Sequence, residues 1–165
     1  MKFQLASILL LGSLVSFTSA ASGILTEKNL SLELADKLAQ SAIRSCSTNN
    51  YNVAVTVVDS AGIPLVIKRM DNAGPHTFEA SQMKAFTALT TRNTTENVMT
   101  GAQSNTGAAN LRDIPGFLLL AGGVPVKVGE TTVGAIGVGG APGGHLDQQC
   151  AFDAVKSVQN DLNAG

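Results

Sequence analysis

The sequence predicts an α+β layered domain whose sheet is largely antiparallel. Helix and strand patterns follow one another in the order helix, two strands, two helices, three strands and helix. Most strands are joined by links of hairpin length, and hairpins connect antiparallel strands. A doubly wound fold would instead alternate strands with crossover helices along the chain. The order and the short links therefore favour a layered domain over a fold built from parallel strands.

Residues 1–20 have the pattern of a secretory signal peptide. Lys2 supplies the positive charge, a mostly apolar stretch follows it, and small residues offer a cleavage site after Ala20. A membrane anchor is the alternative, but serines and a glycine interrupt the apolar stretch, which is shorter than a membrane span. We therefore expect one domain over residues 21–165, periplasmic or secreted, with no membrane contact after cleavage.

The first half of the domain is expected to contain two helices and a hairpin. Apolar residues recur at helical spacing over residues 34–46. Branched residues alternate over residues 51–59, which predicts a strand. The turn "DSAG" leads into a second strand over residues 63–70, so the two strands form a hairpin. A second helical pattern follows the loop "DNAGPH" and covers residues 77–91.

The second half is expected to add a short helix, three strands and a final helix. The short helix covers residues 93–105. Three short strands are expected over residues 116–121, 124–128 and 131–138, because "GG" and "GE" between them are tight hairpin signals. The chain closes with an amphipathic helix over residues 147–162.

Composition excludes several classes of function. The formal net charge is −1 and no basic cluster occurs, so nucleic acid is not an expected partner. The stretch "GVGGAP" at residues 137–142 approaches a dinucleotide-binding fingerprint, but no strand–helix–strand unit follows it. No phosphate loop, nucleophile elbow or paired-cysteine zinc spacing is present. A hydrolase or a Rossmann enzyme is therefore not expected.

Two segments resemble the GlcG/HbpS-like family. "RMDNAGPHTFEASQMKAFTALT" resembles an Arg-x-Asp strand end followed by a Lys-Ala-x-Thr-Ala helix. "GGVPVKVGETTVGAIGVGGAPGGHLDQQCA" resembles a Gly-Gly-x-Pro hairpin, a Gly-Ala-Ile-Gly-Val-x-Gly strand and a helix that opens with an aspartate. The matching positions are Arg69, Asp71, Lys84, Ala85, Thr87, Ala88, Gly122, Gly123, Pro125, Gly134 to Val138, Gly140 and Asp147. The sequence departs from the family at "GGHLDQQ", where an acidic run is commoner.

The resemblance implies a profilin-like domain, a five-stranded antiparallel sheet flanked by helices, similar to the C-terminal domain of PduO-type cobalamin adenosyltransferases. It implies an exported haem- or tetrapyrrole-binding protein for haem or iron binding, buffering or sensing. A corrinoid is the alternative cofactor. The alternative function is an enzyme or binding protein for a small organic acid of the glycolate type, or a haem-degrading protein; a binding protein is favoured over an enzyme.

The resemblance also implies a homo-oligomer, with an octamer as the favoured assembly. The run "FLLL" at residues 117–120 points the same way. One sheet face buries only alternate residues of a strand, so the remaining side chains need a second layer or another subunit.

The two cysteines are expected to form a disulfide. Cys46 lies on the apolar stripe of the first helix and Cys150 on that of the last. In a profilin-like domain the two terminal helices share one face of the sheet, and two cysteines in an exported protein usually pair. The alternative is two inert thiols in the core.

The resemblance places the ligand site on the two matching segments. Arg69 and Lys84 are the expected partners of anionic ligand groups such as haem propionates. The alternative for Arg69, together with Asp71, is an ion pair or a turn, and the alternative for Lys84 is a solvated charge on a helix face. The glycines expected to let a ligand approach the backbone are Gly122, Gly123, Gly137 and Gly140. The alternative for these glycines is close packing of the hairpin against a helix.

The expected iron ligands are His76 and His145. Haem iron takes an imidazole, a thioether, a thiolate or a phenolate, and both cysteines are assigned to the disulfide. His76 is slightly favoured because its loop joins the segments that carry the resemblance.

Overall fold

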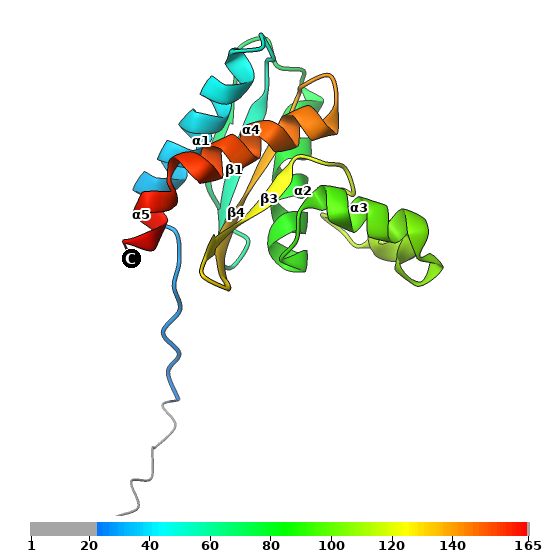
Figure 1. The fold of residues 1–165 in the computed structure, drawn as a ribbon. Helices are drawn as coiled ribbons and strands as arrows, with labels where there is room; N and C mark the ends of the chain where they lie inside the picture. Colours follow the sequence, from blue (N-terminus) through cyan, green and yellow to red (C-terminus); the bar gives the residue numbers. More distant parts are fainter. Residues whose placement is uncertain (1–22, 165) are drawn as a thin grey trace, which may run out of the picture.

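A four-stranded antiparallel sheet lies between two layers of helices (Figure 1). The structure is a computed structural model that describes residues 23–164, so the predicted signal peptide lies outside the described residues. The strands are β1 (Ala54–Asp59), β2 (Pro64–Arg69), β3 (Gly123–Val128) and β4 (Thr131–Gly139), in the spatial order β2-β1-β4-β3. Every neighbouring pair is antiparallel. The predicted α+β class is therefore confirmed, whereas the profilin-like description stays a prediction.

The expected fifth strand over residues 116–121 is wrong, because this segment is an irregular connection. The Leu118 N–H donates to the Thr87 hydroxyl of the neighbouring helix at 2.9 Å rather than to a strand. The Phe117 ring packs edge-on against Phe86, with ring centroids 6.1 Å apart. The apolar run is thus held by contacts with a helix, and the sheet of the described residues has four strands rather than five.

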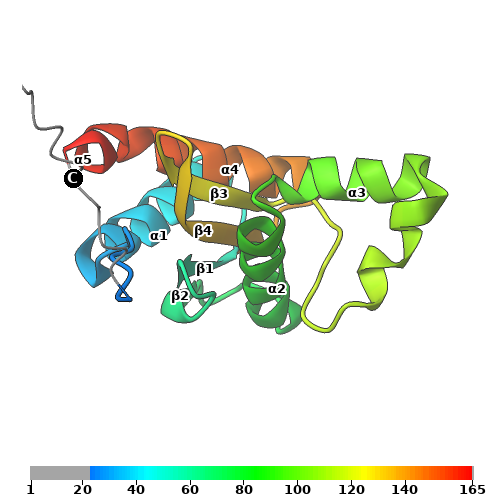
Figure 2. The ribbon, with the colours of Figure 1, turned by 90° about the horizontal axis from the view of Figure 1, so that it is seen from below.

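Helices cover both faces of the sheet. α1 (Leu32–Ser47) and α4 (Gly144–Ser157) lie on one face, and α2 (His76–Thr91) lies on the other (Figure 2). α4 begins three residues earlier than the expected start at Asp147, and it ends before Val158, after which the short α5 (Gln159–Asn163) completes the segment. α3 (Thr95–Ser104) and the 3-10 helix η1 (Thr106–Asp113) project away from the sheet.

The main core fills the space between the sheet and the helices α1 and α4. Ser31 caps α1 by accepting a hydrogen bond from the Leu34 N–H. Five members of the predicted stripe of α1 are buried, namely Ala35, Leu38, Ala39, Ala42 and Cys46, whereas Leu34 and Ile43 are half-buried at its edges. β1 is buried on both faces because a helix layer covers each of them. Within the described residues no helix is long and apolar enough to cross a membrane.

α2 lies unusually close to β4 because of a glycine. A Cβ atom added to Gly137 would lie 2.1 Å from the Ser81 carbonyl oxygen, so any side chain there would push the helix off the sheet. The buried hydroxyls of Thr56 on β1 and Ser81 on α2 are hydrogen-bonded at 2.8 Å. Part of the glycine content of β4 therefore serves helix–sheet packing.

A disulfide joins Cys46 of α1 to Cys150 of α4, as predicted. Both residues are buried, and their Cα atoms are 5.5 Å apart. The bond links positions 104 residues apart, so it closes most of the domain into one covalent loop. A loop of that length restricts the unfolded chain strongly.

Removing the disulfide is expected to lower the free energy of unfolding by about 2–5 kcal/mol. Urea unfolding of the disulfide-bonded protein, with and without a reducing agent, measures the difference. The variant with Cys46→Ala and Cys150→Ala is the control, because its stability should not respond to the reducing agent. An unchanged unfolding midpoint on reduction of the native chain would contradict a stabilising role.

Candidate functional site

Two loops that carry predicted site residues begin at the same end of the sheet. Ala54, at the start of β1, pairs with Arg69 at the end of β2 and with Gly139 at the end of β4. The chain leaves β2 through a short loop and enters α2 at His76; it leaves β4 through the glycine-rich loop and enters α4 at Gly144. The starts of both helices therefore lie at this end, the upper end in Figure 1.

Both histidines stand at the start of a helix and are exposed. His76 is the first residue of α2, and His145 is the second residue of α4. Each imidazole folds back over a glycine, since an added Cβ on Gly74 or Gly143 would lie 2.9 or 2.8 Å from the ring. Among the described residues neither imidazole has a hydrogen-bond or ion-pair partner. Both rings are thus available to an external partner.

Arg69 organises the loop before α2. Its side chain is exposed, and one guanidinium nitrogen donates to the Ala73 carbonyl oxygen at 2.5 Å. This bond holds the turn that leads from β2 to His76. A guanidinium carries five N–H donors, and the role of Arg69 toward an anionic group stays a prediction.

Lys84 is neither solvated nor free, because it forms a buried ion pair with Asp147. Its ammonium nitrogen lies 2.8 Å from a carboxylate oxygen of Asp147 and 2.9 Å from the Val138 carbonyl oxygen, and it donates to both. The side chains are only 1% and 4% exposed. The second oxygen of Asp147 accepts the Ala141 N–H at 2.9 Å. Contact between Lys84 and a ligand stays a prediction, and it would require this pair to open.

Burial is the largest influence on both members of the pair. It raises the pKa of the Asp147 carboxyl and lowers the pKa of the Lys84 ammonium, because each charge loses its hydration. The opposite charge of the partner and the hydrogen bond between the two groups act against these shifts. Each charge is therefore tolerated in the interior only while the other is present.

Gly122 provides the space for this pair. Its backbone has a φ of +130°, and an added Cβ would lie 2.5 Å from the Val138 carbonyl oxygen and 2.8 Å from the Lys84 ammonium nitrogen. Gly123 and Gly140 are packed similarly, against the Lys84 carbonyl and the Asn52 carbonyl. These glycines, with Gly137, thus accommodate the chain's own backbone, and their contact with a ligand stays a prediction.

The sequence predicted Asp147 as an acidic residue at the start of a helix, and it did not predict the buried ion pair. It does lie in the first turn of α4, where a carboxylate is favoured. Its ion-pair partner is 63 residues earlier in the chain, on the opposite side of the sheet. No rule of sequence spacing predicts a contact between two such positions. The available sequence signal for Asp147 was the family resemblance, which includes an aspartate at the start of this helix.

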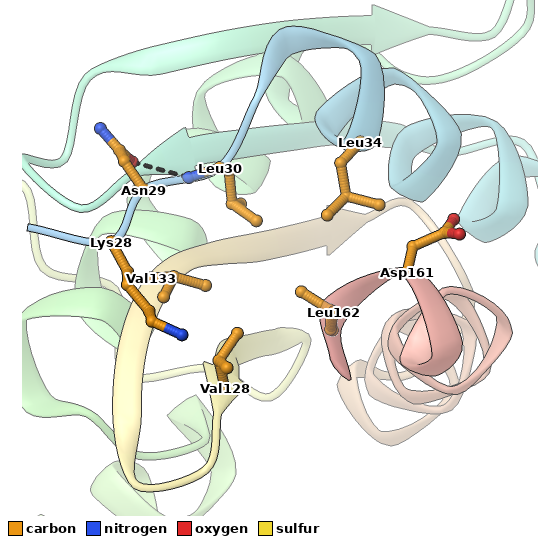
Figure 3. Close-up of a pocket in the computed structure, with 8 residues that line it drawn as sticks. All are labelled: Lys28, Asn29, Leu30, Leu34, Val128, Val133, Asp161 and Leu162. Atoms are coloured by element: carbon orange, nitrogen blue, oxygen red, sulfur yellow. Dashed lines mark hydrogen bonds between the residues drawn. The ribbon is translucent and has the colours of Figure 1, made fainter. Parts of the chain in front are cut away.

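A separate hollow lies at the other end of the sheet (Figure 3). Its walls come from the segment before α1, the β3–β4 hairpin and α5, and its apolar lining includes Leu30, Leu34, Val133 and Leu162. Lys28 and Asp161 stand at its rim. Its volume of about 180 Å³ is below the range of about 300–1,000 Å³ typical of ligand pockets. None of the predicted site residues lines this hollow.

Comparisons with known proteins agree with this architecture. The model of the HbpS-like family, described as "Haem degrading protein HbpS-like", matches residues 30–156. GlcG of Escherichia coli K12 is 33% identical over 113 residues, which are 68% of this chain and 83% of GlcG. A crystal structure of an HbpS double mutant from Streptomyces reticuli is 36% identical with a TM-score of 0.79, covering 87% of this chain and 97% of that one.

The structure of PduOC in complex with heme has a TM-score of 0.71 at 21% identity, covering 78% of this chain and 94% of that one, and shows the shared fold alone. The class of protein is thus a small α+β domain with an antiparallel sheet between helices and glycine-rich loops at one end. Within that class, the chain belongs to the GlcG/HbpS-like family.

Substituting Lys84 with methionine is expected to lower the free energy of unfolding by about 3–5 kcal/mol, because it leaves the Asp147 carboxylate buried without a partner. The variant with both Lys84→Met and Asp147→Leu should recover much of that loss, since no lone charge remains. Urea unfolding measures both effects.

The matched control is Lys37→Met, which removes a lysine from an ion pair with Glu33 that is exposed to solvent. Its unfolding midpoint should stay close to that of the native chain. A double variant that is as unstable as Lys84→Met alone would show that the buried charge is not the cause.

Proposed function

We propose that this protein binds haem through the loops that present His76 and His145. The observation that carries the proposal is the placement of two exposed imidazoles, both without a partner among the described residues, at one end of the sheet. Membership of a family whose description names haem supports the choice of ligand. Binding for buffering, transport or sensing of haem or iron is the function that this site suits.

The donor set fits a haem group. Imidazole is a common axial ligand of haem iron, which supplies electron-transfer or oxygen chemistry when it is bound. Arg69, exposed beside the His76 loop, is suited to pair with a propionate by a charge-assisted hydrogen bond. Lys84 is less suited to this role, because Asp147 and the Val138 carbonyl occupy its donors. His76 is the favoured iron ligand and His145 the second candidate. A corrinoid is the alternative tetrapyrrole.

The proposal includes export and assembly. We expect cleavage after Ala20 and a periplasmic or secreted mature protein. The disulfide between Cys46 and Cys150 supports this expectation, because disulfides form and persist in oxidising compartments. We also expect a homo-oligomer, with an octamer as the favoured size. Exposed apolar residues on the described surface, among them Ile63, Ile114 and Leu120, support assembly.

Degradation of haem is the second candidate function, and the description of the family is what favours it. In that case the same histidine end would hold haem as a substrate rather than as a lasting ligand. Turnover of a small organic acid is the other alternative, but no contact in the described residues favours it over haem.

Titration with haem is expected to produce a Soret band that saturates at one haem per chain. His76→Ala should shift the band and weaken binding by about tenfold or more, because the iron loses an axial ligand. The chain has two histidines, so the variant with His76→Ala and His145→Ala removes every imidazole. Unchanged spectra and affinity in that double variant would overturn histidine ligation.

The role proposed for Arg69 has a matched control at the opposite end of α2. Arg69→Gln should weaken haem binding, whereas Arg92→Gln, at the C-terminal end of the helix, should not. Hydrogen peroxide then separates the two functions: a stable Soret band indicates binding, and decay faster than that of free haem indicates degradation. A corrinoid that competes with haem would broaden the ligand class to tetrapyrroles.

A further inference from the structure

The chain contains two copies of the Asn-x-Ser/Thr sequence to which sugar chains are attached in secreted proteins. Asn29 begins the copy "NLS" and Asn93 begins the copy "NTT", and neither copy has proline at its middle position. In a protein that passes through the secretory pathway, this sequence is an acceptor for an asparagine-linked glycan. The disulfide and the expected signal peptide are features of such a protein.

Both asparagines are exposed in the folded domain, although buried residues lie close to each of them. Asn29 directly precedes the buried Leu30, and Asn93 lies in the turn between α2 and α3, two residues before the buried Thr95. A glycan is bulky and polar, so a folded protein can carry it only on a side chain that reaches solvent. Asn29 and Asn93 both meet this requirement.

The oxygen of each side-chain amide is anchored, whereas its nitrogen is not. The Asn29 Oδ1 accepts the N–H groups of Leu30 and Ser60, both at 2.9 Å. The Asn93 Oδ1 accepts two hydrogen bonds as well, one from its own turn and one from the Asn97 Nδ2. Neither Nδ2 donates a hydrogen bond within the part of the chain that the structure describes. A sugar on this nitrogen therefore leaves the contacts of the oxygen intact.

Both asparagines lie at the end of the sheet opposite the histidines. Asn29 contacts Ser60 in the turn between β1 and β2, and Asn93 follows the C-terminal end of α2, the helix that begins at His76. A hollow lined by Ser60 and Arg92, among others, joins that turn to the end of the helix. α2 has 16 residues, so its two ends are about 24 Å apart. Glycans at this end would leave both histidines accessible.

We infer that Asn29 and Asn93 carry asparagine-linked glycans, and that the chain is therefore secreted through the membrane system of a eukaryotic cell. The donor is an oligosaccharide joined to a membrane lipid through diphosphate. The amide nitrogen attacks the first carbon of the sugar, a C–N bond forms, and the C–O bond to the diphosphate breaks. The lipid diphosphate leaves and takes up the proton that the nitrogen loses. The inference rests on the export included in the proposed function.

Mass spectrometry of the mature protein, isolated from the medium of its native cells, tests the inference. Peptide N-glycosidase removes the sugar chain and converts the modified asparagine to aspartate, which takes up heavy oxygen when the reaction is run in oxygen-18 water. We expect a fall in the mass of the protein and a heavy label at both Asn29 and Asn93. Absence of label and of any mass change would overturn the inference, and absence at one position would overturn the assignment of that position.

A matched pair of variants links the glycan to its acceptor. Asn93→Gln should remove one glycan, whereas Asn97→Gln should remove none, because Asn97 is not followed by serine or threonine two positions later. Both substitutions disrupt the hydrogen bond between these two side chains, so a folding defect would affect both variants alike. Equal loss of the glycan from the two variants would contradict attachment at Asn93.

The amino terminus of the same protein separates glycosylation from export. A chain that retains residues 1–20 and carries no glycan overturns the export. A chain that lacks them and carries no glycan overturns the glycans alone and leaves export standing. Haem titration before and after removal of the glycans should give the same affinity, and a change of about tenfold or more would contradict their placement away from the histidines.

Discussion

The buried ion pair between Lys84 and Asp147 is the constraint on which the arrangement of this domain depends. It joins α2 on one face of the sheet to α4 on the other, and it passes the sheet where β4 ends. A salt bridge this deeply buried gives modest net stability, but leaving either charge alone is costly. The two helix layers are therefore held in one relative position, with the Val138 carbonyl as the third member of the contact.

The same contact fixes the candidate site. Asp147 also accepts the Ala141 N–H, so its carboxylate holds the glycine-rich loop as well as Lys84. That loop leads directly to His145, and Lys84 belongs to the helix that begins with His76. One buried pair thus sets the position of both histidine-bearing helix starts relative to the sheet. Contacts of this kind hold the residues of a site in place without touching the molecule that the site binds.

The glycines of the chain serve the same purpose. Gly122 leaves room for the ion pair, and Gly137 lets α2 lie directly on β4. On the other face, the disulfide between α1 and α4 holds the layer that carries Asp147. The glycine-rich strand, the buried ion pair and the disulfide together form a rigid frame. The exposed candidate residues lie at the end of this frame, in the loops and at the helix starts.

The sequence by itself determined what local patterns and composition can encode. The apolar stripe of α1, the alternation in β1 and the short hairpin links predicted the layers, and the family resemblance predicted the pairing of Cys46 with Cys150. The tertiary structure decided the rest. "FLLL" has no period, so only its contacts with Thr87 and Phe86 show that it is not a strand. Lys84 and Asp147 meet across the end of the sheet, because folding brings together charges whose distance along the chain carries no signal.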